Sequence, residues 1–104
     1  MSLAVDAAGR VIASTPQGLL VSSNRGTTFS AWPDAPRLAG LSTSPDHSRV
    51  VGVGAKGKVW TTTSGAQNWI EVGAIHGIAQ AVTITNSGDI LVVDDSGLTL
   101  IPSE

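Results

Sequence analysis

Short apolar runs, separated by turns rich in Gly, Asp and Asn, follow one another along the chain and recur with a period of about 40 residues. Three copies can be aligned: residues 9–13 and 18–21 correspond to 48–52 and 57–60, and then to 88–92 and 97–100. In each copy the two runs begin nine residues apart. A repeat of this length, built from short strands and tight turns, is typical of β-propeller blades.

Each repeat predicts a series of antiparallel strands, because its runs are rich in Val, Ile, Leu and Thr and no segment shows the apolar period of a helix. We expect strands over residues 3–6, 10–15, 19–23, 27–32, 37–42, 49–54, 58–63, 67–72, 79–85, 89–94 and 98–101. Gly18, Gly57 and Gly97 share one place in the repeat, where a tight turn requires a positive φ.

The predicted fold class is therefore all-β, with residues 1–104 forming one β-propeller segment. It has about three four-stranded antiparallel blades, over residues 2–36, 37–77 and 78–104, and the last blade lacks its outer strand. A closed ring needs at least about four blades. We therefore expect the chain to close by self-association, most simply as two chains with about six blades, or to be part of a larger propeller.

Composition excludes several classes of function. The formal charge is −2 and only 13% of the residues are charged, so the chain has no basic field for nucleic acid. No apolar run approaches the roughly 20 residues of a membrane-spanning helix. The chain has no cysteine, and its two histidines and its acidic residues match no metal motif, so we expect neither a metal nor a cofactor.

A turn in the first repeat carries a recognisable motif: Ser22, Asn24, Gly26, Thr28 and Phe29 follow the pattern Ser/Thr-x-Asp-x-Gly-x-Thr-aromatic, with Asn24 in place of Asp. This turn resembles the Asp-box of BNR-repeat propellers. The second repeat keeps the Thr, the Gly and the aromatic residue of the box over residues 61–69, and the third has no box. We expect the box to be structural: residue 24 hydrogen-bonds amides across the turn, Gly26 turns the corner, and Phe29 packs between sheets.

The BNR group includes sialidase-like proteins, sortilin-type receptors and photosystem II stability factors, and the chain resembles most the bacterial sialidase-like exported proteins of unassigned activity. This resemblance implies a secreted or periplasmic location. Sialidase chemistry implies an arginine cluster, a Tyr nucleophile assisted by Glu, and an acidic Asp. The chain has no Tyr and only four arginines, so we expect no catalytic residue within it.

Polar residues on the turns of one propeller face are the candidates for ligand binding. The connections between blades and the turns between second and third strands open on the same face, so these residues would gather around one mouth: Gln17, Asp34, Arg37, Lys56, His76, Asp94 and Asp95. The simpler alternative is that these residues bind no ligand and are ordinary solvent-exposed polar residues of surface loops. The run Gly52-Val53-Gly54-Ala55-Lys56-Gly57 matches a dinucleotide fingerprint, but β-branched residues follow it where a helix is required.

Three functions remain after these exclusions. The first is a non-enzymatic binding or scaffold module with a protein or carbohydrate ligand. Another is an assembly factor that holds a partner protein on the ring face. The alternative is a part of an exported sialidase-like glycoside hydrolase whose catalytic residues lie outside this chain.

Overall fold

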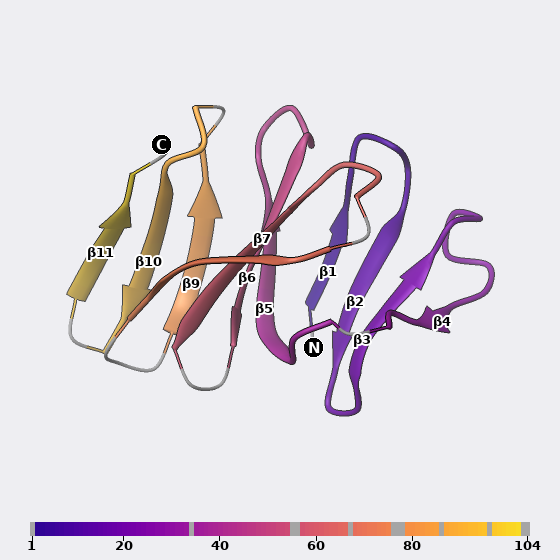
Figure 1. Ribbon diagram of the computed structural model, residues 1–104, viewed down its shortest axis with the longest axis horizontal. Coiled ribbons are helices and arrows are strands. Elements are labelled where there is room, and N and C mark those ends of the chain that lie inside the picture. Colours follow the sequence, from indigo (N-terminus) through magenta and orange to yellow (C-terminus); the bar gives the residue numbers. More distant parts are fainter. Residues whose placement is uncertain are drawn as a thin grey trace.

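The computed structural model describes residues 2–33, 35–54, 57–66, 68–75, 79–85, 87–95 and 97–102, and for Ala79 the backbone alone. The described residues form three antiparallel sheets, which lie side by side in chain order (Figure 1). They contain no helix of the length and apolar character that crossing a membrane requires.

Sheet 1 has the order β1-β2-β3-β4 and sheet 2 the order β5-β6-β7-β8, whereas sheet 3 has the order β9-β10-β11. The bounds are β1 Ser2–Val5, β2 Val11–Thr15, β3 Gly18–Ser22, β4 Ser30–Ala31, β5 Leu38–Thr43, β6 Arg49–Gly54, β7 Lys58–Thr63, β8 Ile70–Ala74, β9 Ala79–Ile84, β10 Ile90–Asp94 and β11 Gly97–Ile101. The all-β fold with two four-stranded sheets and a third that lacks an outer strand is as predicted.

The outer strands differ most from the prediction. The strand expected over residues 27–32 is only Ser30–Ala31, because the residues before it form a hydrogen-bonded turn. The outer strand of sheet 2 was predicted from residue 67 but begins at Ile70. Side-chain hydrogen bonds to the backbone compete with a sheet ladder, and before β4 the polar side chains of Ser22 and Asn24 favour the turn.

Two apolar layers hold the three sheets together. Sheets 1 and 2 enclose a core of Ala4, Ile12, Leu19, Trp32, Leu38, Leu41 and Val50. Sheets 2 and 3 enclose a second core of Val51, Val53, Val59, Ile75, Ile84, Ile90 and Val92. Val50 and Val51 are both fully buried although they are neighbours on β6, because successive side chains point to opposite faces and sheet 2 is covered on both.

The turns between second and third strands follow the repeat. Gly18, Gly57 and Gly97 have φ of 126°, 82° and 132°, so the positive φ predicted at this place is confirmed. At Gly57 a side chain would also be excluded by space, because a Cβ atom would lie 2.5 Å from the carbonyl oxygen of Ile75.

The turns between first and second strands share a different feature, a hydrogen bond from a backbone N–H to a side-chain oxygen across the turn. A side-chain oxygen at the start of each turn accepts a hydrogen bond from the backbone N–H that opens the return strand, and the three pairs are Asp6 with Arg10, Ser44 with Arg49, and Thr85 with Asp89. The corner of the turn has a positive φ at Gly9, His47 and Gly88. The sequence alignment put Ser48 at this corner, one residue too late, because the second turn is one residue longer.

Candidate ligand-binding groove along the inner strands

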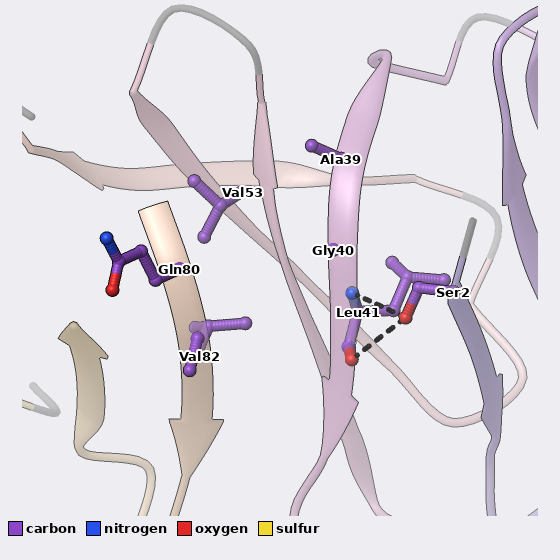
Figure 2. Close-up of a pocket in the computed structure, with 8 residues that line it drawn as sticks. Ser2, Ala39, Gly40, Leu41, Val53, Gln80 and Val82 are labelled. Atoms are coloured by element: carbon purple, nitrogen blue, oxygen red, sulfur yellow. Dashed lines mark hydrogen bonds between the residues drawn. The ribbon is translucent and has the colours of Figure 1, made fainter. Parts of the chain in front are cut away.

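A groove with a volume of about 370 Å³ lies beside the first strands of the three sheets, β1, β5 and β9 (Figure 2). It is lined by Ser2, Ala39, Gly40, Leu41, Val53, Gln80, Ala81 and Val82. Each of these strands is the edge of its sheet, so one row of its backbone N–H and C=O groups is free of ladder hydrogen bonds. The groove is therefore framed by three sheet edges, and on the β5 edge the N–H and C=O of Leu41 already bind the hydroxyl of Ser2.

Two β-bulges occur at the same place in successive sheets, and both bulged residues line the groove. In β5, Leu38 pairs with Gly54 and Gly40 pairs with Val53, which leaves Ala39 as the extra residue. In β9, Ala79 pairs with Asp94 and Ala81 with Val93, which leaves Gln80. A bulge bends its strand and redirects the side chain, and such bulges are frequent next to binding sites.

Small residues occupy one level of the three inner strands. Ser2, Gly40 and Ala81 lie opposite Ser14, Val53 and Val93, which hold equivalent places in the three repeats. The three inner strands therefore offer a hydroxymethyl group, no side chain and a methyl group at one level. A Cβ atom added at Gly40 would meet nothing within 4 Å, so the space in front of this residue is empty.

Ser2 joins the edges of sheets 1 and 2 at one side of the groove. Its hydroxyl oxygen accepts a hydrogen bond from the N–H of Leu41 at 3.1 Å and donates to the carbonyl oxygen of Leu41 at 3.4 Å (Figure 2). Its own backbone N–H donates to the hydroxyl of Ser14 at 3.0 Å. Gln80 and Val82 of β9 form the opposite side.

The groove is neutral, since none of its eight lining residues carries a charge. Its polar groups are the hydroxyl of Ser2, the exposed amide of Gln80 and the backbone of the strand edges. Such a set can hydrogen-bond an uncharged ligand, and it offers no carboxylate for acid–base work. Over the described ranges, no group of three or more His, Asp or Glu side chains is placed to hold a metal ion.

The polar residues predicted for the ligand face do not line this groove where they are described. Gln17 and Asp95 are exposed in the turns that precede β3 and β11, Arg37 is exposed just before β5, and Asp94 is buried at the end of β10. These turns lie at the end of the sheets where the two bulges occur (Figure 1, lower edge). Asp34, Lys56 and His76 are outside the described residues, so their gathering around one mouth stays a prediction.

Sequence reasoning missed the bulged strands, although they leave a signal. Small residues interrupt the apolar alternation at Ala39-Gly40 and at Ala79-Gln80-Ala81, and a glycine inside a strand pattern often marks a bulge. The groove is bordered by strand edges and not by the loops that carry the predicted ligand-face residues.

The turn after β3 shows the hydrogen bonds predicted for residue 24. The Asn24 side-chain carbonyl accepts from the hydroxyl of Ser22 at 2.7 Å and from the N–H of Thr28 at 3.0 Å, and its amide donates to the Thr28 hydroxyl at 2.7 Å. Ser22 also accepts from the N–H of Gly26, which has a φ of 87°. The expectation that Phe29 packs between sheets is wrong: the residue is 41% exposed.

Comparisons with known proteins bear on the fold. No protein-family model matches the chain, and no curated protein matches it. Among solved structures, the chain is similar to the β-propeller protein YCF48 from Cyanidioschyzon merolae, with a TM-score of 0.64 and 19% sequence identity over 96% of this chain. The chain spans 35% of the length of that protein. At this identity the likeness shows the fold, and together with the three sheets it identifies the chain as a partial β-propeller.

Proposed function

We propose that this chain is a non-enzymatic binding module that holds a neutral, extended segment of a partner protein in the groove between β1, β5 and β9. The observation that carries the proposal is the pair of equivalent bulges, Ala39 and Gln80, which open an uncharged groove beside three sheet edges. A volume of about 370 Å³ is within the range of sites that bind small molecules or short segments.

The chemistry of the groove favours a peptide main chain as its ligand. An extended segment alternates N–H and C=O groups, and a strand edge offers the complementary groups in the same alternation. The small residues Gly40, Ala39 and Ala81 allow another backbone to approach closely. The exposed amide of Gln80 can donate and accept at once, which suits a main-chain amide and gives no preference for charge.

A glycoside hydrolase is less well supported. Glycosidases of the common type need two carboxyl groups that flank the bond to be cleaved, and the residues lining the groove include neither Asp nor Glu. Arg10, which a carboxylate-binding site could have used, already binds Asp6 and the carbonyl oxygen of Ala66 within the fold. The hydrolase hypothesis therefore still requires residues outside this chain.

Selection from a library of displayed peptides tests the proposal, with neutral oligosaccharides as a second set of probes. Gly40→Leu fills the groove without meeting a neighbouring atom at Cβ, and Ala31→Leu places the same side chain at an exposed position on β4. We expect selected peptides to bind the wild type and Ala31→Leu equally, and to lose at least about tenfold in affinity for Gly40→Leu.

Three outcomes would contradict the proposal. If selected peptides bind Gly40→Leu as tightly as the wild type, the binding surface lies elsewhere, and variants of Arg37 and Asp95 would then test the loop face. If oligosaccharides bind and peptides do not, the ligand class is wrong. If neither set of probes binds the wild type, the groove is not a binding site.

A further inference from the structure

Sheet 3 presents an apolar face on the side that is turned away from sheet 2. Leu91 pairs with Leu100, and Val93 pairs with Leu98, so these four side chains lie on one face of the sheet. Leu98 is 65% exposed, and Val93 and Leu100 are also exposed. The alternating residues, Ile90 and Val92 among them, point the other way into the core shared with sheet 2.

Sheet 1 has a corresponding exposed face on its side away from sheet 2. Leu3 is 68% exposed and Val5 is exposed as well, whereas Ala4 between them is buried against sheet 2. Leu3 lies opposite Ala13 and Val5 lies opposite Val11, so the apolar character continues from β1 onto β2. Each end of the row of sheets therefore carries one exposed apolar face.

The repeat shows what the free face of sheet 3 is built to contact. Leu91 holds the place of Ile12 in sheet 1 and of Val51 in sheet 2. Ile12 is fully buried against sheet 2, and Val51 is fully buried against sheet 3. In both interfaces of the structure, the residue at this position packs on the following sheet. In sheet 3 the residue is Leu91, and no sheet follows sheet 3 among the described residues.

The free face of sheet 1 is the opposite half of the same interface. Val11 holds the place of Val50 in sheet 2 and of Ile90 in sheet 3. Val50 is buried in the core with sheet 1, and Ile90 is buried in the core with sheet 2, so this position packs on the preceding sheet. The two exposed faces of the chain are therefore complementary to each other in the way that sheets 1 and 2 are.

We propose that a second copy of this chain covers both faces. Sheet 3 of each copy packs on sheet 1 of its partner, and the two identical contacts close a ring of six sheets. Each contact joins two different surfaces, and a twofold axis repeats it, so the two contacts together form one closed, self-complementary dimer interface. Six sheets lie within the four to eight blades of known propellers.

In such a ring the first strands of all six sheets, β1, β5 and β9 of each copy, surround one central axis, so the grooves of the two copies open onto the same channel. This inference does not depend on the proposed ligand, because it is tested by molecular mass, whereas the ligand is tested by peptide binding.

Sedimentation velocity of the full chain between about 1 and 50 µM tests the assembly. We expect a single species of twice the chain mass of 10.6 kDa. Leu98→Asp on sheet 3 and Leu3→Asp on sheet 1 should each give monomers, because either change puts a charge into both contacts of the ring. Ile70→Asp is the matched control: Ile70 is 64% exposed on β8, away from both end faces, and this variant should remain a dimer.

Mixing the two monomeric variants separates a head-to-tail contact from a face-to-face contact. Leu98→Asp retains an intact sheet 1 and Leu3→Asp retains an intact sheet 3, so the mixture should form a two-chain complex through one unaltered contact, more weakly than the wild type. Far-UV circular dichroism of each variant checks that it is folded; both altered side chains are well exposed, so the monomer fold should be retained.

Each other outcome overturns the proposal. A wild-type monomer at these concentrations means that something other than a second copy covers the faces, such as further sheets of a longer polypeptide. A dimer that is lost in only one of the two variants, or a mixture that stays monomeric, rules out the head-to-tail contact. A larger oligomer or a filament rules out closure by two copies.

Discussion

Asp6 and Arg10 form an ion pair at 2.7 Å, between Oδ2 and Nε, within the first turn of sheet 1, and both side chains also hydrogen-bond the turn before β8 in sheet 2. The Asp6 side chain is fully buried, and its Oδ2 also accepts from the N–H of Gly65 at 3.3 Å. Arg10 donates from a terminal nitrogen to the carbonyl oxygen of Ala66 at 2.7 Å and lies 4.8 Å from the ring centre of Trp32. The pair thereby fixes sheet 1 against sheet 2.

Removal of the Arg10 guanidinium should destabilise the fold strongly. Arg10→Ala leaves the buried carboxylate of Asp6 without its charged partner, which typically costs about 3–5 kcal/mol. Arg10→Lys should recover only part of this, because an ammonium group cannot match the planar fork that binds Asp6 and Ala66 together. Urea unfolding of both variants and of Arg49→Ala, the exposed residue at the equivalent place, gives the measurement. Equal losses in Arg10→Ala and Arg49→Ala would contradict this role.

The free energy of unfolding should fall at acidic pH, because two carboxyl groups have lowered pKa values in the folded protein. Burial raises the pKa of Asp6. Hydrogen bonds from Arg10 and Gly65, together with the Arg10 charge, lower it by more, so the pKa lies below its ordinary value of 3.8. Hydrogen bonds from Ser44, and from the N–H and hydroxyl of Ser48, lower the pKa of Asp46 to about 2. A carboxyl group with a lowered pKa stabilises the fold above its unfolded-state pKa and loses this contribution as the pH falls through its folded-state pKa.

Urea unfolding between pH 7 and pH 2 measures this dependence. We expect the free energy of unfolding to decrease from about pH 4 downward. Asp46→Asn retains an acceptor oxygen but cannot titrate, so its decrease over the same interval should be smaller than that of the wild type. A decrease of the same size in both would exclude Asp46 as a contributor.

The turn after β3 should depend on an acceptor at residue 24. Asn24→Ala removes the oxygen that accepts from Ser22 and Thr28, and we expect a loss of about 1 kcal/mol in the free energy of unfolding. Asn24→Asp keeps this oxygen, and its second oxygen can accept from the Thr28 hydroxyl, so it should stay within about 0.5 kcal/mol of the wild type. Thermal or urea unfolding distinguishes the two, and a large loss in Asn24→Asp would count against the geometry.

Arg25 occupies a backbone conformation that favours glycine. Its φ is 64°, and its side chain is exposed. Arg25→Gly should therefore raise the free energy of unfolding, by about 0.5–1 kcal/mol after the greater flexibility of glycine in the unfolded chain is subtracted. Arg25→Ala keeps the unfavourable φ and serves as the control, which we expect to be neutral or slightly destabilised. A gain in both variants would mean that the Arg25 side chain, and not its backbone, is the cause.

Trp69 carries a buried indole N–H that has no hydrogen-bond partner among the described residues. Trp69→Phe removes this donor and keeps an aromatic ring against Trp32, whose ring centre lies 5.5 Å away. The relief of the unsatisfied group should offset the lost contact area, so we expect a change of less than about 1 kcal/mol. Trp32→Phe should cost about 2 kcal/mol, because Trp32 is buried and stacks with Arg10. Equal losses in the two variants would contradict this difference.

The sequence by itself determined the first three strands of each sheet, the tight turns between them and the order of the sheets, but not the extent of the outer strands β4 and β8. Strands and turns are local: alternating apolar residues and glycines such as Gly18, Gly57 and Gly97 specify them without reference to the rest of the chain. The period of the repeat then predicted three similar sheets, and the solved propeller to which the chain is similar confirmed the fold.

Only the tertiary structure decided where the groove lies and how the sheets are joined. A bulge such as Ala39 or Gln80 exists only in relation to the strand opposite, because it is one residue more than the partner strand provides. The contact of Arg10 with Ala66 likewise spans 56 positions of the chain and depends on how two sheets pack. Small residues in a strand pattern can signal a bulge, but the pairing itself depends on a distant strand, which is why the groove along the inner strands was not predicted from the sequence.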